Sequence, residues 1–160
     1  INCYFRSNND YDVALVRLSQ DIQFSARVGP ACMPFKFRGS TFGNTLITAL
    51  GWGTLFFGGP TSPTLQKVNL NIQTDNECRN KGANVTPRQL CTFTPGKDTC
   101  QFDSGGPLMY TDGSNGLLYN VGIVSEGDYC ATSKPGINTR VTEVMDWVTA
   151  NSPDAFYCIK

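Results

Sequence analysis

Short apolar segments alternate with turn-forming residues along most of this chain. Six of these segments are rich in Val, Ile, Leu and Tyr, and clusters of Gly, Pro, Asn or Asp separate most of them. Short strands at this spacing are typical of an all-β barrel or sandwich. The expected strands span residues 11–18, 45–49, 65–72, 107–110, 117–124 and 136–141, and the Pro- and Gly-containing residues 28–44 are expected to form a connector.

Helical periodicity is confined to two places. Near the C-terminus, Val144, Trp147 and Val148 repeat at helical spacing, and Thr142 before them is a residue type that caps helix N-termini. A shorter helical turn is expected to begin at Asp75. The sequence therefore predicts a mostly β molecule with one persuasive helix close to its end.

Charge and hydropathy exclude several classes of protein. Thirteen basic and thirteen acidic residues among 160 give no net charge, so the chain lacks a broad electrostatic footprint for nucleic acid or an anionic membrane. The most apolar stretch, residues 46–57, is too short to cross a bilayer and contains two glycines. An apolar content of 40% also excludes a disordered chain.

The chain has seven cysteines and no histidine. No two cysteines form a C-x-x-C pair, so we expect no metal site, and nothing indicates a cofactor. Scattered cysteines in a Gly-rich chain favour disulfides in an oxidising compartment, although buried free thiols of a cytosolic protein are the alternative. Asn84 begins an Asn-Val-Thr glycosylation acceptor, which agrees with secretion.

The strongest local signal is the segment Cys-Gln-Phe-Asp-Ser-Gly-Gly-Pro-Leu that spans residues 100–108. A serine before two glycines suits a nucleophile on a tight turn, because glycines let the backbone approach a substrate carbonyl and aim N–H groups at an oxyanion. Phe102 excludes the G-x-S-x-G elbow of α/β-hydrolases. A D-S-G-G turn alone is more often a polar loop, so other motifs must decide.

Four motifs in order resemble the chymotrypsin/trypsin-like serine protease family. They are Asp-Val-Ala-Leu-Val-Arg-Leu at residues 12–18, Leu-Gly-Trp-Gly at 50–53, the 100–108 segment, and Gly-Ile-Val-Ser at 122–125. Ser104 follows Asp12 by 92 residues, close to the separation of about 93 in the family's triad. The resemblance covers essentially the whole chain and is nearest to arthropod secreted enzymes, including venom and salivary proteases with an upstream CUB-type module.

The resemblance implies an all-β, chymotrypsin-like fold of two six-stranded antiparallel barrels with a C-terminal helix. Residues 1–27 would be the remnant of an incomplete first barrel, 28–44 the connector, and 45–160 the second barrel with the helix. It also implies a secreted enzyme that cleaves peptide bonds after Arg or Lys.

The implied catalytic residues are Ser104 as nucleophile and Asp12 as the carboxylate that orients a histidine base. Taken alone, Asp12 would be read as a turn aspartate before a strand. The family places its histidine before the aspartate, in a segment that we expect to lie upstream of these residues. The chain by itself is therefore expected to be inactive.

Specificity also follows from the resemblance. Asp98, six positions before the serine, corresponds to the base of the primary pocket, where a carboxylate pairs with substrate Arg or Lys. Gly127 and Gly136 match small pocket-wall positions, and Ser125 matches a residue that bonds the substrate backbone. The alternative for Asp98 is a solvated loop charge beside Lys97.

The resemblance assigns an activation switch to Asp103, which would bind the ammonium group freed when a zymogen is cut. That switch would shape an oxyanion hole made by the backbone N–H groups of Phe102 and Ser104. Three residues depart from the family pattern, one of them Asn138 in place of a common tyrosine of the pocket region. Phe102 stands where glycine is usual, and Glu126 replaces a tryptophan beside the substrate backbone, which favours basic neighbours.

The resemblance to the family implies disulfides between Cys78 and Cys91 and between Cys100 and Cys130. We expect Cys3 to pair with Cys158, and Cys32 to tether an upstream propeptide or CUB-type module that lies outside this chain. Protein or peptide substrates with Arg or Lys at the cleaved bond are the other expected partners. A non-catalytic homologue that binds or regulates is the competing hypothesis, and a disulfide-rich structural fragment would leave the ordered motifs unexplained.

Overall fold

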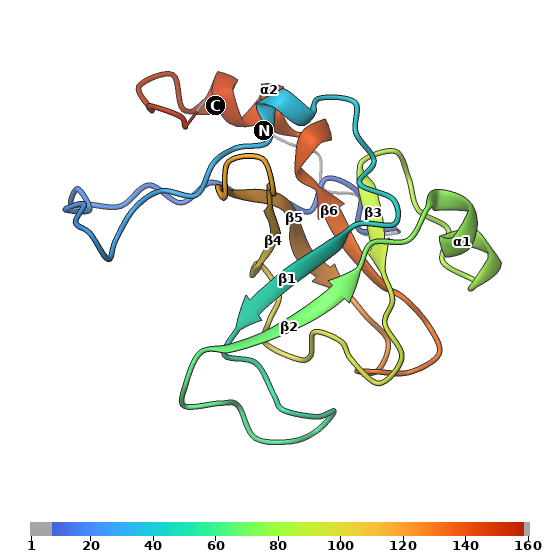
Figure 1. Ribbon diagram of the computed structural model, residues 1–160. Coiled ribbons are helices and arrows are strands. Elements are labelled where there is room, and N and C mark those ends of the chain that lie inside the picture. Colours follow the sequence, from blue (N-terminus) through green and yellow to red (C-terminus); the bar gives the residue numbers. More distant parts are fainter. Residues whose placement is uncertain (1–7, 159–160) are drawn as a thin grey trace.

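Six antiparallel strands form one curled sheet in the computed structural model, which describes residues 8–158 (Figure 1). The strand order across the sheet is β2-β1-β4-β5-β6-β3. The all-β class and the C-terminal helix are confirmed. The strands are β1 (Leu46–Gly51), β2 (Gln66–Asn71), β3 (Gln89–Thr92), β4 (Pro107–Thr111), β5 (Leu118–Glu126) and β6 (Gly136–Arg140).

The sheet curls until its two edge strands touch. Just beyond β2, Ile72 forms an isolated bridge with Thr92 of β3, and the Phe93 N–H donates to the Asn71 carbonyl at 2.9 Å. Closing a sheet on itself satisfies backbone groups that an open edge would leave unpaired. The alternating inward side chains of the strands then fill one core. Its buried members are Cys32, Phe42, Ile47, Ala49, Leu70, Ile72, Leu90, Leu108, Tyr119, Val121 and Val124.

A β-bulge interrupts the pairing of β5 with β6. Val124 lies opposite Asn138, and Glu126 lies opposite Ile137, so Ser125 is an extra residue without a partner in the ladder. Bulges of this kind re-aim a side chain and are common next to active sites. The bulge therefore singles out Ser125, a residue that the sequence motif had already marked.

Two short α-helices flank the sheet (Figure 1). Helix α1 (Asp75–Asn80) begins with a complete capping box, in which Thr74 and Glu77 satisfy each other's backbone N–H groups. Helix α2 (Met145–Asn151) follows the 3-10 turn η2 (Val141–Glu143), so the expectation that Thr142 caps the helix is wrong. A further 3-10 turn, η1 (Phe35–Phe37), lies in the connector. Within residues 8–158, no helix is long and apolar enough to cross a membrane.

Three disulfides are present among the described residues. Cys78–Cys91 and Cys100–Cys130 form as expected. The third joins Cys32 to Cys158, with 4.8 Å between their Cα atoms, so the expected Cys3–Cys158 pair and the expected tether from Cys32 to an upstream module are both wrong. The chain after α2 packs on the connector, where the rings of Tyr157 and Phe35 meet edge to face at 5.6 Å. Cys3 lies outside the described residues.

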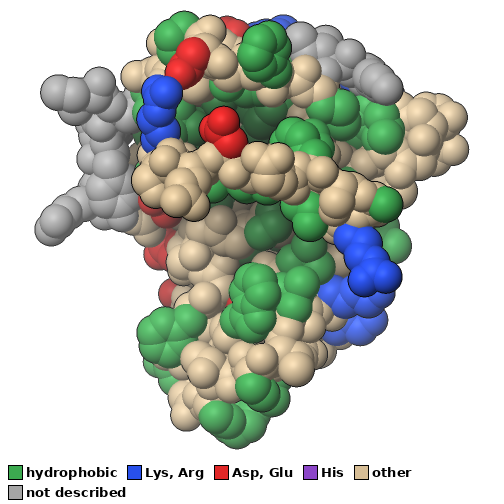
Figure 2. All heavy atoms as spheres, turned by 90° about the vertical axis from the view of Figure 1, so that its left-hand side faces the viewer, with side chains coloured by type: hydrophobic (Ala, Val, Ile, Leu, Met, Phe, Trp, Pro, Cys, Tyr) green, Lys and Arg blue, Asp and Glu red, His purple; other side chains and the backbone are tan. Residues whose placement is uncertain are grey.

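Residues 14–31 form an extended arm that leaves the sheet, and the strand expected at 11–18 is wrong. A β-strand needs a hydrogen-bonding neighbour, and among the described residues no strand pairs with this arm, which holds only a local bridge between Ser25 and Val28. Its apolar side chains are consequently exposed, with Val16 at 83% and Phe24 at 66%. Figure 2 looks onto this side of the molecule and shows hydrophobic side chains at the surface with few charged ones among them.

Candidate active site

The loop that carries Ser104 is fastened to strand β5. The Gly105 N–H donates to the Val124 carbonyl at 2.8 Å, and the Val124 N–H donates to the Gly106 carbonyl at 2.9 Å. Gly105 has a φ of +83°, a conformation that glycine adopts without strain. The turn holds its backbone against the sheet and leaves Ser104 exposed to solvent. This is the presentation that a nucleophilic serine requires.

Asp12 is held by two hydroxyl groups from neighbouring strands. The Ser125 hydroxyl donates to Asp12 Oδ2 at 2.6 Å, and the Thr139 hydroxyl donates to the Asp12 carbonyl oxygen at 2.6 Å. Ser125 adjoins Val124, to which the Ser104 loop is bonded. The carboxylate and the serine are thus anchored at consecutive residues of β5, although 92 positions separate them in the chain. Thr139 carries no motif, so sequence reasoning missed it.

A cavity of about 250 Å³ adjoins Ser104 and is lined by three of the four residues expected to set specificity, whereas Gly136 does not line it. Asp98, Ser125 and Gly127 line it together with Ser104. The Cys100–Cys130 disulfide lies in the same wall and ties its two halves together. A Cβ on Gly136 would stand 3.4 Å from Asp98 Oδ1, so the absence of a side chain there keeps the space beside the carboxylate open.

Asp98 is a carboxylate without a cationic partner. Its oxygens accept hydrogen bonds from the backbone N–H groups of Thr99 at 2.9 Å and Ala131 at 3.1 Å. Within residues 8–158, no Lys or Arg forms an ion pair with it. Burial raises the pKa of Asp98, and the two N–H groups oppose that shift. Such a carboxylate favours a ligand that brings its own positive charge into the cavity.

The backbone at Phe102 and Ser104 has free donors where an oxyanion hole is expected. The N–H groups of Asp103, Gly105 and Gly106 donate to nearby carbonyls, whereas those of Phe102 and Ser104 meet no acceptor among the described residues. Phe102 has a φ of +71°, in the left-handed region that favours glycine. Its side chain is 76% exposed and so extends into solvent. The structure thus retains a glycine-like backbone at this departure from the family pattern.

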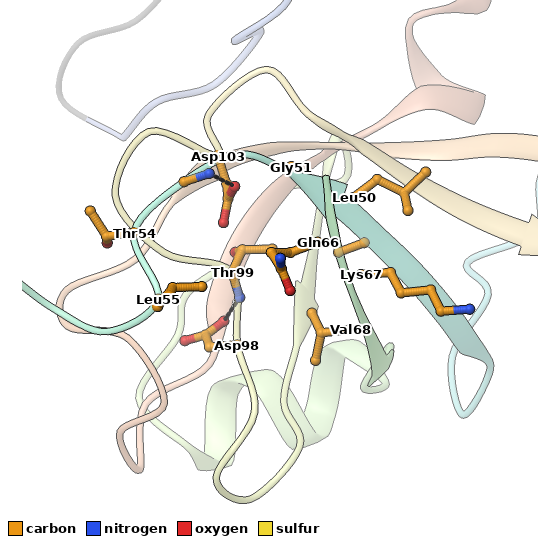
Figure 3. A pocket seen from close by; sticks show the side chains of 12 residues that line it. Leu50, Gly51, Thr54, Leu55, Gln66, Lys67, Val68, Asp98, Thr99 and Asp103 are labelled. Atoms are coloured by element: carbon orange, nitrogen blue, oxygen red, sulfur yellow. Dashed lines mark hydrogen bonds between the residues drawn. The ribbon is translucent and has the colours of Figure 1, made fainter. Parts of the chain in front are cut away.

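Asp103 turns away from Ser104 toward the Leu-Gly-Trp-Gly motif. It accepts hydrogen bonds from the Gly53 N–H at 2.8 Å and the Cys100 N–H at 2.9 Å. A Cβ on Gly53 would stand 2.5 Å from the Asp103 carboxylate, which explains why this motif needs glycine. A second cavity of about 150 Å³ lies beside it, with Asp103 and Asp98 on opposite sides (Figure 3).

Two further residues complete the surroundings. Glu126 lines the cavity beside Ser104 and accepts a hydrogen bond from the Asn9 side chain, and no cation pairs with it in the described part of the chain. Asn84 is exposed in the loop between α1 and β3, so its side chain is accessible for modification. Among residues 8–158, no group of three or more Cys, Asp or Glu side chains is arranged to hold a metal ion.

A curled antiparallel sheet with an exposed serine, an anchored aspartate and a carboxylate-based cavity defines the class of chymotrypsin-like serine proteases. Comparison with protein families agrees, because the Trypsin family model matches residues 2–148. The chain belongs to the Trypsin family.

Individual relatives support the same placement. The chain is 40% identical over 148 residues to venom serine protease 34 of Apis mellifera, covering 92% of this chain and 36% of that protein. It is 37% identical over 156 residues to a venom serine protease of Polistes dominula, covering 96% and 56%. It is 41% identical over 148 residues to trypsin-1 of Astacus astacus, covering 89% and 60%. The chain therefore spans less than two thirds of the length of these relatives.

Proposed function

We propose that the full-length protein is a secreted serine endopeptidase that cleaves protein or peptide substrates after Arg or Lys. The observation that carries the proposal is the cavity beside Ser104. Asp98 lines this cavity and has no cationic partner among residues 8–158, and the small residues Gly127 and Gly136 leave space near its carboxylate. A long cationic side chain fits such a cavity and would pair with its partly buried carboxylate. The three disulfides and the relatives named venom proteases support an extracellular setting.

The proposed reaction follows acyl-enzyme chemistry. Ser104 Oγ attacks the substrate carbonyl carbon while its proton passes to an imidazole, and that proton then leaves with the amine when the peptide bond breaks. Water hydrolyses the resulting ester and regenerates the serine. Since none of the 160 residues is histidine, the imidazole comes from a part of the protein outside them. Asp12 would orient it and stabilise its protonated form.

The remaining roles are proposed with the same mechanism. The free N–H groups of Phe102 and Ser104 would stabilise the oxyanion. The cavity beside Asp103 would receive an ammonium group released by activation cleavage. Asp103 would then exchange its present hydrogen bonds with the Gly53 and Cys100 N–H groups for an ion pair with that ammonium group. Without the imidazole, the 160 residues would retain at most about 10³–10⁴-fold rate enhancement over water.

Glu126 extends the proposed specificity. Its unpaired carboxylate borders the cleft, so a second basic residue near the cleaved bond would be favoured over an acidic one. Asp128 lines the same cavity, but Lys134 already neutralises it.

The test uses the full-length, activated protein. A fluorophosphonate should label the wild type and fail to label Ser104→Ala, and a peptide library should show cleavage after Arg and Lys. Asp98→Ser should abolish that selectivity while leaving the serine reactive toward the probe. Equal cleavage after Arg, Phe and Leu by the wild type would contradict the pocket assignment.

A non-catalytic homologue is the second candidate function. Phe102 favours it, because one of the two proposed oxyanion donors then belongs to a bulky residue at a left-handed φ. In that case the activated full-length protein would bind basic peptides through Asp98 without labelling at Ser104. The same probe therefore separates the two candidates.

A further inference from the structure

The residues just before Asp12 are fastened to the sheet by a buried ion pair. Asp10 is only 4% exposed, and its carboxylate accepts hydrogen bonds from Arg88 Nε at 3.1 and 3.0 Å and from Arg88 Nη2. A guanidinium that grips both oxygens of a carboxylate fixes orientation as well as distance. Arg88 lies at the entry to β3, so the pair links the amino-terminal segment directly to the edge of the sheet.

Neighbouring side chains reinforce this ion pair. The Thr86 hydroxyl donates to Asp10 Oδ1 at 2.9 Å. Gln89 Nε2 donates to the backbone carbonyl of Asn8 at 2.8 Å. Hydrogen bonding to Arg88 lowers the pKa of Asp10, although burial opposes the shift, so the carboxylate is ionised at neutral pH. These contacts come from the four residues that run into β3, and the Asn9 side chain adds a hydrogen bond to Glu126 of β5.

Tyr11 connects this anchor to Asp12. The Arg88 guanidinium lies over the Tyr11 ring at 4.4 Å from its centroid, so the same arginine holds two successive residues. Tyr11 has a φ of +57°, which a tyrosine adopts only where its surroundings impose it. The constrained backbone at Tyr11 determines the direction in which the chain enters Asp12.

We infer that Arg88 is a positioning residue for the Asp12 carboxylate, acting through its grip on Asp10 and Tyr11; this rests on the proposed catalytic role of Asp12. Beyond Val13 the chain passes into the exposed arm, which an exposed Arg17–Asp154 ion pair holds at 2.8 Å. Exposed ion pairs stabilise little, so the arm gives Asp12 little support from the other side. The Ser125 and Thr139 hydroxyls bond Asp12 itself, and the Arg88 anchor fixes the backbone that delivers it. Loss of the anchor should therefore misplace the carboxylate without touching Ser104 or the Asp98 cavity.

The test is a double-mutant cycle in the activated full-length protein. Arg88→Met should lower kcat by about 10- to 100-fold, because small misplacements of a catalytic group have effects of this size, while KM stays within about twofold. In an Asp12→Ala background the same substitution should change kcat by less than about twofold, since no carboxylate is left to misplace. Arg88→Lys, which keeps charge but not the two-pronged grip, should give an intermediate loss and serves if Arg88→Met does not fold.

Arg38→Met is the matched control. Arg38 also grips both oxygens of a carboxylate, that of Asp146, but this pair is exposed and joins the end of η1 to α2, and neither residue lines the cavity beside Ser104. Its loss should leave kcat unchanged. The inference would be overturned if Arg88→Met lowered kcat equally in both backgrounds. It would also be overturned if Arg88→Met left kcat unchanged when the rate is divided by the titrated concentration of active sites.

Hydrogen exchange separates failure of this inference from failure of the proposed function. If Ser104→Ala retains activity or the wild type has none, the proposed function is wrong. The Val13 N–H, which donates to the Tyr11 carbonyl at 2.8 Å, should still exchange about tenfold faster in Arg88→Met if the anchor holds this segment. Unchanged exchange at Val13 would overturn the anchor whatever the activity.

Discussion

Asp98 combines a partly buried charge with space for a ligand, and the two properties together predict a pH dependence. Because burial raises the pKa of Asp98, its carboxyl takes up a proton at a higher pH than an exposed aspartate does. A guanidinium ligand binds the ionised form. Affinity should therefore be constant above the raised pKa and fall by about tenfold per pH unit below it.

The measurement is calorimetric titration of the full-length protein with agmatine between pH 3.5 and 7. Asp98→Asn should bind weakly at every pH, because no ionisable group remains at that position. An affinity that begins to fall only below the usual aspartate range, about pH 3.9, would contradict the proposed coupling.

Gly53 is predicted to be intolerant of any side chain. A Cβ there would stand 2.5 Å from the Asp103 carboxylate and 2.6 Å from the Gln101 carbonyl oxygen. Gly53→Ala should lower the free energy of unfolding by about 1–3 kcal/mol, the usual range for a forced overlap. Gly113→Ala is the control, since its Cβ would meet nothing within 4 Å. Urea unfolding of both variants measures the difference, and equal midpoints would refute the prediction.

Individual residues of the site were predictable only where a motif marks them. Ser104 and Asp103 lie in the 100–108 motif and Asp98 lies two residues before it, and the structure places all three around the two adjoining cavities. The Thr139 contact with the Asp12 carbonyl was not predictable, because it depends on how β6 lies against a segment 127 residues earlier. Arg88 was missed for the same reason.

At the scale of secondary-structure elements, α1 gives a local test. Thr74 accepts from the Glu77 N–H at 3.3 Å, and Glu77 Oε2 accepts from the Thr74 N–H at 2.8 Å. Thr74→Ala should lower the free energy of unfolding by about 1 kcal/mol through loss of the cap. Thr64→Ala, in the loop before β2, is an exposed threonine for comparison. Denaturant unfolding checks the result, and a loss no larger than that of the control would show that the cap is dispensable.

Strands were predicted correctly where both the strand and its hydrogen-bonding neighbour lie in the chain. Five of the six expected apolar segments match β1, β2, β4, β5 and β6 to within a few residues. The segment at 11–18 has the right composition but no neighbour among the described residues, and pairing rather than propensity makes a strand. Strand β3 was missed because Gln89 and Thr92 break its apolar pattern, although both are buried.

At the scale of the whole molecule, the exposed arm predicts association. Leu15, Val16, Leu18, Ile22 and Phe24 are all exposed, and the arm forms one wall of a wide groove with the chain after α2. Exposed apolar patches of this kind drive association. The 160-residue chain produced alone should therefore self-associate.

The substitution Val16→Asp should shift the 160-residue chain toward monomer in analytical ultracentrifugation. Leu65→Asp, at an exposed position before β2, should have less effect. A monomeric wild type, or an equal shift in both variants, would show that the arm does not drive association.

The packing of the whole molecule also determines which cysteines pair. The Cys78–Cys91 pair joins α1 to β3 and the Cys100–Cys130 pair joins two loops, and the resemblance to the family predicted both. The Cys32–Cys158 pair joins residues 126 positions apart and depends on where the last residues dock. Sequence alone offers no measure of that docking, which is why the third pairing failed.

The unpaired position at Ser125 has a consequence for insertions and deletions. Val124 pairs with Asn138 and Glu126 pairs with the adjacent Ile137, so deleting Ser125 would leave both pairs in register and close the bulge into a regular ladder. The deletion would remove the hydroxyl that donates to Asp12 Oδ2. Deleting a paired residue of β5 would instead move the residues that follow it to the opposite face of the sheet. Loss of Ser125 should therefore spare the sheet and cost the Asp12 contact, whereas loss of a paired neighbour should damage the sheet itself.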